Sequence, residues 1–348
     1  MRMRRRHARS ATAGPPRPAA TILSVLAFAA GLAAATPAHA QQTWVVNVVG
    51  LGGAPEYTER FTDWARRIET ALVERWEVDP DQITTLGEDA ALEGVDGESR
   101  RETIEATLAR IGAEAGPADR VLLVLIGHGT FRNDQAALNL PGRDPSASDW
   151  NAMLAPLGDR PVGIVNVASS SGPFVEALSA PGRVIVTATR SGRERNETQF
   201  GEFFAEALEG DAADLDKDGA LSLLEAFVFA RSETARYYAE EGLLATEHAQ
   251  IDDDGDGEAT DLPTADTTDG PLAATFRFGG RAAAAAASDD PAVAALEAER
   301  AEIEAQVVLL RQRRGEMGAE EYDAALEALL VELALKNREI AAARGGGA

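Results

Sequence analysis

The apolar run RVLLVLIG at residues 120–127 constrains the fold of this chain more than any other stretch. Consecutive large apolar residues without a charge are typical of a strand that is buried on both faces. Further strands are expected at 43–50, 82–86, 161–167 and 183–189, with helical stretches between them. This alternation predicts a three-layer α/β/α domain in which helices cover both faces of a mostly parallel sheet.

The helices that join these strands are expected where apolar side chains recur at helical spacing. In the first helix, Phe61, Trp64 and Ile68 fall on one face. Ser99 and Glu102 form a capping-box pattern, which predicts that a second helix begins there. The remaining predicted helices, with the first, cover residues 56–76, 147–157, 173–180, 196–208 and 222–241. In such a sheet, ligands bind beyond the carboxyl ends of the strands.

The first forty residues have the layout of a secretory signal. Five arginines lie within the first nine residues, an apolar stretch follows at 20–35, and TPAHA precedes Gln41. This layout predicts cleavage after Ala40 and export to a periplasm or beyond. A transmembrane anchor is the alternative, but the apolar run is short and rich in alanine. We therefore expect no membrane anchor after cleavage.

The chain is strongly acidic, with 33 Lys and Arg against 57 Asp and Glu and a net charge of −24. Loss of the signal segment makes the balance more negative, because that segment holds arginines and no acid. The charge disfavours nucleic acid and anionic membrane surfaces as partners and favours cations. The chain has no cysteine, which excludes disulfides, thiolate metal sites and a thiolate nucleophile.

Two turns of small residues follow neighbouring apolar strands and form the candidate catalytic centre. His128 stands between two glycines directly after the strand 120–127, and NVASSSGPF (166–174) ends the strand 161–167. Glycines beside a histidine allow a ligand to approach closely and leave N–H groups that can bind an oxyanion. Adjacent parallel strands would bring both turns within side-chain reach, with histidine as base and serine as nucleophile.

These elements together resemble the caspase/legumain-type cysteine peptidases, a clan that includes metacaspases and gingipains. In that clan a hydrophobic strand ends in His-Gly, and the next ends in small residues, the nucleophile and Ser-Gly. The resemblance covers residues 43 to 210 and is carried by VLLVLIGHGT (121–130), LNLPGRD (138–144), PVGIVNVASSSG (161–172) and RVIVTATRSG (183–192). It implies that His128 is the catalytic histidine, that the N–H of Gly129 binds the oxyanion, and that Ser169 stands where the clan has its cysteine.

Serine in place of cysteine leaves the expected activity open. A serine hydroxyl is far less acidic than a thiol and needs a well-oriented base. The clan's acidic residue two positions before the nucleophile is Val167 here, and the remaining acids in nearby loops are Asp134, Asp144 and Asp149. We favour a degenerate peptidase whose pocket binds a peptide or protein partner. The alternatives are an active Ser-His peptidase and a scaffold whose C-terminal helices mediate oligomerisation.

The stretch DLDKDGALSLLE (214–225) matches the twelve-residue calcium loop of the EF-hand at every diagnostic position. Carboxylates stand at positions 1, 3 and 5, Gly219 allows the sharp turn at position 6, and a glutamate stands at position 12. The expected Ca²⁺ ligands are Asp214, Asp216, Asp218, Ala220 through its carbonyl, Ser222 and Glu225. Helices are expected on both sides of this loop, as the motif requires.

A second acidic loop begins with DDDGDG at 252–257. Its expected ligands are Asp252, Asp254 and Asp256. The twelfth position is Pro263, so Asp261 would have to substitute and binding would be weaker. His248 is expected to be a packing or capping residue rather than a ligand. We expect Ca²⁺ to act as a structural staple, with a calcium switch as the alternative.

The segments after residue 210 are expected to be appendages of the α/β domain at 41–210. Residues 211–280 hold the acidic loops and end in AATFRFGG (273–280), a predicted strand that returns to the core. Residues 281–291 form a predicted linker. The remaining segment, 292–348, has two helical halves that are broken at Gly315 and Gly318. These halves predict an antiparallel helical hairpin that could self-associate, with one long coiled-coil helix as the alternative.

Overall fold

The computed structural model of the protein describes residues 41–263, 267–278, 290–312 and 317–345. The predicted signal segment, most of the predicted linker and Gly315 lie outside these residues. Within the described ranges, no helix has both the length and the apolar character that a membrane span requires.

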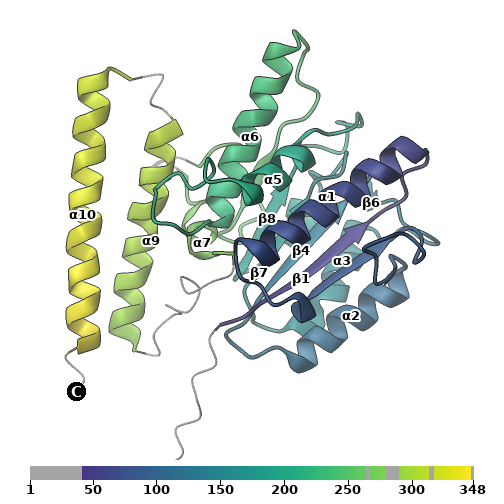
Figure 1. Cartoon of the computed structure of the whole chain (residues 1–348), viewed down its shortest axis with the longest axis horizontal. Helices are drawn as coiled ribbons and strands as arrows, with labels where there is room; N and C mark the ends of the chain where they lie inside the picture. The colour runs from purple at the N-terminus through teal and green to yellow at the C-terminus, as the bar shows by residue number, and fades with distance from the viewer. Residues whose placement is uncertain (1–40, 264–266, 279–289, 313–316, 346–348) are drawn as a thin grey trace, which may run out of the picture. The chain divides into compact units, whose positions relative to one another are not determined.

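A seven-stranded sheet organises the α/β domain (Figure 1). Its strands, in spatial order, are β3 (Gly97–Glu98), β2 (Ile83–Gly87), β1 (Thr43–Val49), β4 (Arg120–Ile126), β7 (Val162–Asn166), β8 (Arg183–Thr187) and β9 (Gln250–Asp252). Neighbouring strands pair in parallel except for β8 and β9. The predicted α/β class with a mostly parallel sheet is therefore confirmed. A hairpin of β5 (Gly129–Arg132) and β6 (Gln135–Leu138) follows β4.

Helices connect the strands, as the sequence predicted. They are α1 (Pro55–Glu74), α2 (Arg101–Glu114), α3 (Ala147–Leu154), α4 (Phe174–Leu178), α5 (Phe200–Glu209), α6 (Leu223–Glu240), α7 (Pro271–Thr275), α9 (Pro291–Gln312) and α10 (Ala319–Gly345), with single 3-10 turns at Pro80–Gln82 and Ala155–Leu157. Pro55 begins α1, where its missing N–H breaks no helical hydrogen bond. The apolar face of α1, including Phe61, Trp64 and Ile68, is buried.

Alternate residues of the strands enter two separate hydrophobic cores. In β1, Val45 and Val49 belong to a core that also contains buried residues of α1, α5 and α6. Val46 and Val48 belong to a second core with α2, α3 and α4. Both faces of the long strands are buried in this way, as their continuous apolar runs predicted.

The start of α2 differs from the prediction. Its N-cap residue is Arg100, without a side-chain capping bond, so the predicted capping box of Ser99 and Glu102 is wrong. Ser99 is fully buried, and its hydroxyl donates to the carbonyl of Val49 at the end of β1, 2.7 Å away. The hydroxyl thus joins the end of β1 to the segment that precedes α2. Capping boxes do begin α3 and α6.

The segment predicted as a return strand at 273–280 does return to the core through Phe276 and Phe278, but over its described residues it is not a regular strand. Residues 271–275 form α7, and of the described residues after it only Arg277 makes a β-bridge, to Ser222. The cause is local, because Pro271 opens a helix and the carboxylate of Asp253 accepts the N–H groups of Gly270 and Ala273. The strand that completes the sheet is instead β9.

The order of the strands leaves a switch point between β1 and β4. β1 leads to β2 on one side, whereas β4 lies on its other side and leads to β7 and β8. The N–H of Gly50, just after β1, donates to the carbonyl of Ile126 at the end of β4 over 2.7 Å. Loops that diverge at such a point form the crevice in which α/β proteins bind ligands. His128 follows Ile126 by two residues and therefore lies at the carboxyl end of β4, beside this switch point.

The C-terminal helices α9 and α10 run side by side (Figure 1). Ion pairs join Lys336 to Glu299 and Arg344 to Glu297, so residues later in α10 meet residues earlier in α9. Such pairing requires an antiparallel arrangement. α9 also packs against α7, and Arg277 forms an ion pair with Glu304 of α9, 3.0 Å apart.

Candidate active site and candidate metal centres

His128 lies at the carboxyl end of β4 with its ring against α1. The ring makes edge contacts with Tyr57 and Phe61, with centroids 4.6 and 5.0 Å away. Burial lowers the pKa of His128 below its ordinary value, and the charge of Glu197 opposes this shift. The imidazole is therefore neutral at neutral pH, in the form that can accept a proton.

Ser169 lies in the turn after β7, which is the parallel neighbour of β4. The side chain is buried, and its hydroxyl oxygen is 3.2 Å from the backbone nitrogen of Gly129, whose N–H it accepts. The two predicted catalytic groups, a nucleophile and an oxyanion donor, are thus bonded to each other. In the part of the chain that the structure describes, no hydrogen bond joins Ser169 to His128. A Cβ atom built on Gly129 would come within 1.9 Å of the Ser169 carbonyl oxygen, so glycine is required here.

The other two serines of the turn have different surroundings. Ser170 has a left-handed backbone with φ of 57°, and its N–H donates to the carbonyl of Glu194. Its buried hydroxyl has no hydrogen-bond partner within the described chain. Ser171 is bonded to Thr189 after β8, with 3.0 Å between the hydroxyls and 3.2 Å from the Thr189 nitrogen. Ser171 therefore ties the turns after β7 and β8 together.

The three acids that the sequence placed near the catalytic centre serve other elements. Asp144 accepts the N–H of Leu140, and Asp149 belongs to the capping box of α3. Asp134 has a left-handed backbone in the turn between β5 and β6. The carboxylate whose charge acts on His128 is Glu197, which pairs with Arg60 of α1 at 3.2 Å. Nothing in the sequence pattern identified Glu197.

A cavity of about 570 Å³ opens beside His128. Its walls combine aromatic, charged and apolar side chains, including Tyr57, Arg195, Glu197, Leu243 and Leu244. Leu243 and Leu244 are 56 % and 90 % exposed, so they form an apolar rim. Ser169 is not among the residues that line this cavity. We call this cavity the crevice at His128. It can hold a ligand against His128, while Ser169 stays buried beneath its surface.

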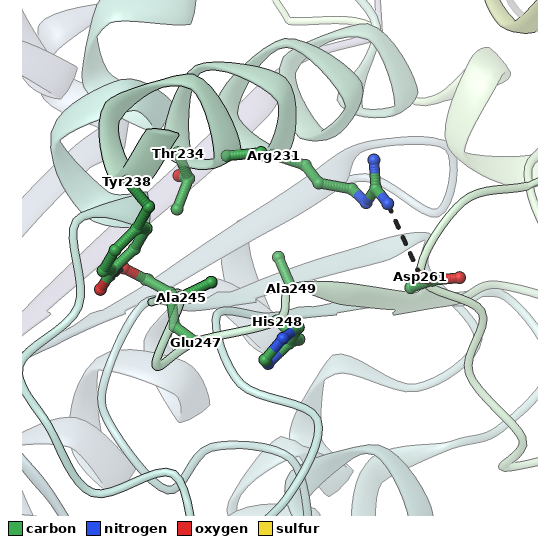
Figure 2. A pocket seen from close by; sticks show the side chains of 9 residues that line it. Arg231, Thr234, Tyr238, Ala245, Glu247, His248, Ala249 and Asp261 are labelled. Atoms are coloured by element: carbon green, nitrogen blue, oxygen red, sulfur yellow. Dashed lines mark hydrogen bonds and ion pairs between the residues drawn. The ribbon is translucent and has the colours of Figure 1, made fainter. Parts of the chain in front are cut away.

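His248 and Glu247 lie near this crevice on the chain between α6 and β9. The Nδ1 atom of His248 is 2.7 Å from a carboxylate oxygen of Glu194. Figure 2 shows His248 beside a small pocket that Arg231 and Asp261 border, with 3.6 Å between their charged groups. The sequence predicted a packing or capping role for His248, and its observed contact is with an acid.

Glu247 has a capping role that the sequence analysis missed. It is buried and accepts the N–H groups of Gln199 and Phe200 at the start of α5, at 2.7 and 3.1 Å. The Tyr238 hydroxyl donates to the same carboxylate over 3.0 Å. Burial raises the pKa of Glu247 to about 7, and these hydrogen bonds oppose the shift.

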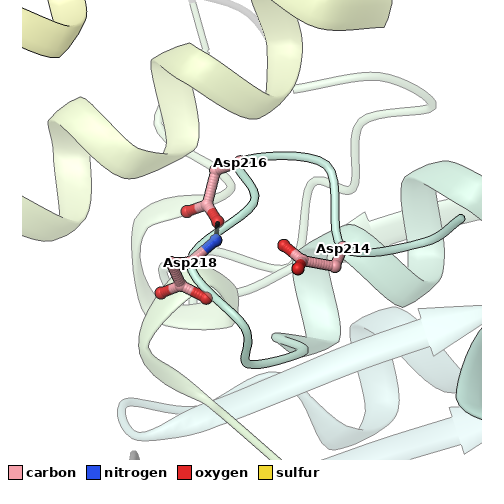
Figure 3. Close-up of side chains that lie close together, drawn as sticks. All are labelled: Asp214, Asp216 and Asp218. Atoms are coloured by element: carbon pink, nitrogen blue, oxygen red, sulfur yellow. Dashed lines mark hydrogen bonds between the residues drawn. The ribbon is translucent and has the colours of Figure 1, made fainter. Parts of the chain in front are cut away.

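The first acidic loop brings three of its predicted ligands together. Carboxylate oxygens of Asp214, Asp216 and Asp218 lie within 4.8 Å of one another (Figure 3). Gly219 has φ of 82° and donates its N–H to Asp214 over 3.2 Å. The N–H of Ala220 donates to Asp218 over 2.8 Å. The loop therefore turns its carboxylates inward by using them as acceptors for its own backbone.

Glu225, the predicted twelfth ligand, lies beneath this loop. It is 3 % exposed, accepts from the Ser222 N–H and hydroxyl, and reaches back to accept the N–H of Leu215 over 2.8 Å. Burial raises the pKa of Glu225. Burial and the charges of Glu225 and Asp218 raise the pKa of Asp216 to about 7. Such a set of crowded carboxylates gains stability from a cation.

The second acidic loop is completed by a residue that the sequence analysis did not name. Oxygens of Asp252, Asp254 and Asp269 lie within 4.8 Å of one another. Asp256 lies outside this cluster and is exposed, and its carboxylate accepts the N–H of Glu258. Asp261, the predicted substitute, pairs with Arg231. Asp269 follows Asp252 by more than one loop length, so the twelve-residue motif could not reveal it.

Comparison with known proteins found no family model that matches the chain and no curated protein with a significant match.

Proposed function

We propose that the protein is an exported calcium-binding protein with a caspase/legumain-like fold and a degenerate catalytic centre. In this proposal the crevice at His128 binds a peptide or protein partner and does not cleave it. The parallel sheet and the position of His128 and Ser169 after neighbouring strands support the likeness to the clan. The signal-like residues 1–40 support export.

The contact between Ser169 and Gly129 is the observation that carries the proposal. A serine nucleophile needs a base aligned with its hydroxyl and an N–H group that waits for the oxyanion. Here the hydroxyl oxygen accepts the N–H of Gly129, while the ring of His128 packs against Tyr57 and Phe61. Neither requirement is met in this arrangement, which favours binding over catalysis.

The cavity beside His128 supports a peptide as the ligand. The exposed Leu243 and Leu244 offer apolar contacts, and Arg195 and Glu197 offer a donor and an acceptor for polar backbone groups. An extended peptide segment presents both kinds of group at once. Because the ring of His128 is neutral, it could contact such a segment whether or not the peptide carries a charge at that point.

Calcium is proposed for the loop of residues 214–225. Asp214, Asp216, Asp218 and Glu225 supply the carboxylate oxygens that Ca²⁺ prefers, and backbone and hydroxyl oxygens of Ala220 and Ser222 complete the motif. Burial and mutual repulsion raise the pKa values of Asp216 and Glu225, and the charge of bound Ca²⁺ would offset both effects. We propose a weaker second site through Asp252, Asp254 and Asp269. Both would act as staples for the segment after residue 210.

An active serine peptidase is the alternative. The positions of His128 and Ser169 after adjacent parallel strands favour it, because a base and its nucleophile must be neighbours. A fluorophosphonate probe that labels activated serines separates the two proposals. We expect no labelling of the wild type, of Ser169→Ala or of His128→Ala, in calcium or in chelator. Labelling of the wild type that both substitutions abolish would establish the peptidase and overturn the degenerate centre.

A further inference from the structure

Helix α10 presents two different faces. One face packs against α9, with Tyr322 and Ile340 buried and Leu326, Leu329 and Leu333 half-buried between them. The opposite face is exposed along its whole length. We define the outer stripe as Ala324, Ala328, Val331, Leu335, Arg338 and Ala342, all of them exposed. These positions alternate four and three residues apart, which is the spacing of a coiled-coil seam.

The centre of the outer stripe is apolar. Val331 and Leu335 are 55 % and 52 % exposed, and Leu330 beside them is 40 % exposed. In the described residues the other large apolar side chains with such exposure are Leu51, Leu243 and Leu244, which lie elsewhere. Clustered apolar side chains on a polar surface are typical of an interaction site. The stripe runs along one helix with coiled-coil spacing, and a surface of this kind packs best against another helix.

We propose that the outer stripe of α10 binds the outer stripe of a second copy of this chain in an antiparallel pair. The charges of α10 are segregated, and this fixes the direction. Acids dominate its first half, at Glu320, Glu321, Asp323, Glu327 and Glu332. In its second half the stripe carries Arg338, whereas Lys336 and Arg344 pair with Glu299 and Glu297 of α9. Antiparallel pairing brings Glu327 of one copy beside Arg338 of the other, whereas parallel pairing in register would set Arg338 against Arg338.

The stripe is also complementary to itself in one register. When a two-fold axis passes beside residue 333, Val331 of one copy meets Leu335 of the other and Ala324 meets Ala342. Arg338 then meets Ala328 and lies beside Glu327 of the second copy. Four of the five apolar positions of the stripe thus meet another apolar position, and the fifth, Ala328, meets Arg338, the one cation, which lies beside an acid. Self-complementarity of this kind is what a two-fold homodimer requires, and a different partner would not require it.

We expect the dimer to be weak. One pair of helices buries less than the about 1,600 Å² of a standard stable interface. We expect a dissociation constant on the order of micromolar or weaker, so the dimer would form at high local concentration. Because α10 packs on α9 and leaves the crevice at His128 open, pairing would join two binding crevices in one assembly. Two linked crevices would bind a repetitive or clustered partner more tightly than one.

Sedimentation velocity of the full chain over a range of concentrations tests the proposal. We expect the wild type to pass from monomer to dimer, and Val331→Glu with Leu335→Glu to raise the dissociation constant at least about tenfold. The melting temperature should not change, because both side chains are exposed. Asn337→Glu, exposed on α10 but off the stripe, is the matched control and should dimerise like the wild type. A wild type that stays monomeric, or a double variant that dimerises as well as the wild type, overturns the proposal.

A charge reversal tests the direction of the pair. Arg338→Glu places an acid beside Glu327 of the second copy and should weaken the dimer. Adding Glu327→Arg to that variant restores opposite charges and should recover dimerisation. The recovery is expected only for antiparallel α10 helices in the register given above. Failure of the double reversal to recover the dimer overturns this arrangement.

Discussion

The crevice at His128 and the acidic loops are built in opposite ways. In the crevice, backbone contacts set the geometry: Gly129 lies against the carbonyl of Ser169, and the Ser169 hydroxyl accepts its N–H. In the acidic loops, side chains set the geometry: Asp214 and Asp252 accept N–H groups of their own loops. Close backbone packing leaves the serine no route to a substrate, whereas the carboxylates keep oxygens directed at a common centre.

This difference shows why likeness to a catalytic site and capacity for chemistry are separate properties. The turns after β4 and β7 contain the small residues that a nucleophile position needs, and these residues pack closely against each other. The carboxylates of the acidic loops form hydrogen bonds as well, yet a second oxygen or lone pair remains for a cation. We therefore propose that the crevice at His128 binds a partner and that the acidic loops bind Ca²⁺.

Gly129→Ala should have the largest effect on stability. Its Cβ atom would lie within 1.9 Å of the Ser169 carbonyl oxygen, so the turns after β4 and β7 would have to separate. We expect the free energy of unfolding to fall by about 3 kcal/mol, measured by urea denaturation. Gly210→Ala is the matched control, since its Cβ atom would meet nothing closer than 3.8 Å. Equal stability of the two variants would mean that the crevice is not held by this contact.

Asp269→Asn should weaken the second acidic loop selectively. Asparagine keeps an oxygen that can accept the N–H of Asp253, but it lacks the charge that attracts Ca²⁺. We expect the affinity of this site to fall about tenfold, which corresponds to about 1.4 kcal/mol of calcium-dependent stabilisation. The melting temperature in calcium reports this loss, and the value in chelator should not fall. Asp261→Asn is the control. A larger loss of calcium-dependent stabilisation in that variant would mean that Asp261, and not Asp269, is the ligand.

Glu247→Gln should change the pH dependence of stability. Burial raises the pKa of Glu247 from 4.5 to about 7. Between these two values the folded protein holds a proton that the unfolded chain has released, so stability falls as pH rises through this window. We expect the wild type to lose about 3 kcal/mol more than the variant across it, by thermal denaturation at a series of pH values. Identical pH profiles would show that Glu247 titrates alike in both states.

The sequence predicted those parts of the molecule that depend on local pattern. The run 120–127 indicated the central strand, and the turns after β4 and β7 were expected to meet because parallel neighbours end at one edge. The positions of Asp214 and Gly219 followed from a motif within twelve residues. In each case the residues that fix the structure are close in sequence or lie on adjacent strands.

The parts that the sequence did not predict depend on contacts between distant residues. Ser99 bonds to Val49 rather than capping α2, and Asp269 joins Asp252 from outside the motif. The charge of Glu197 raises the pKa of His128, but Glu197 lies in a loop with several other charged residues, and its sequence does not single it out. The return strand failed because Pro271 and Asp253 favour a helix over an extended chain. None of these choices leaves a periodic or motif signal.

Calorimetric titration of Ca²⁺ into the full chain and into Glu225→Gln tests the central claim most directly. The single oxygen of glutamine can still accept the N–H of Leu215 but not also that of Ser222, and the substitution removes the charge of the twelfth loop position. We expect the wild type to bind Ca²⁺ in at least two steps, and the variant to lose the tighter step while it remains folded. A wild type that does not bind Ca²⁺, or a variant whose titration matches the wild type, would contradict the account.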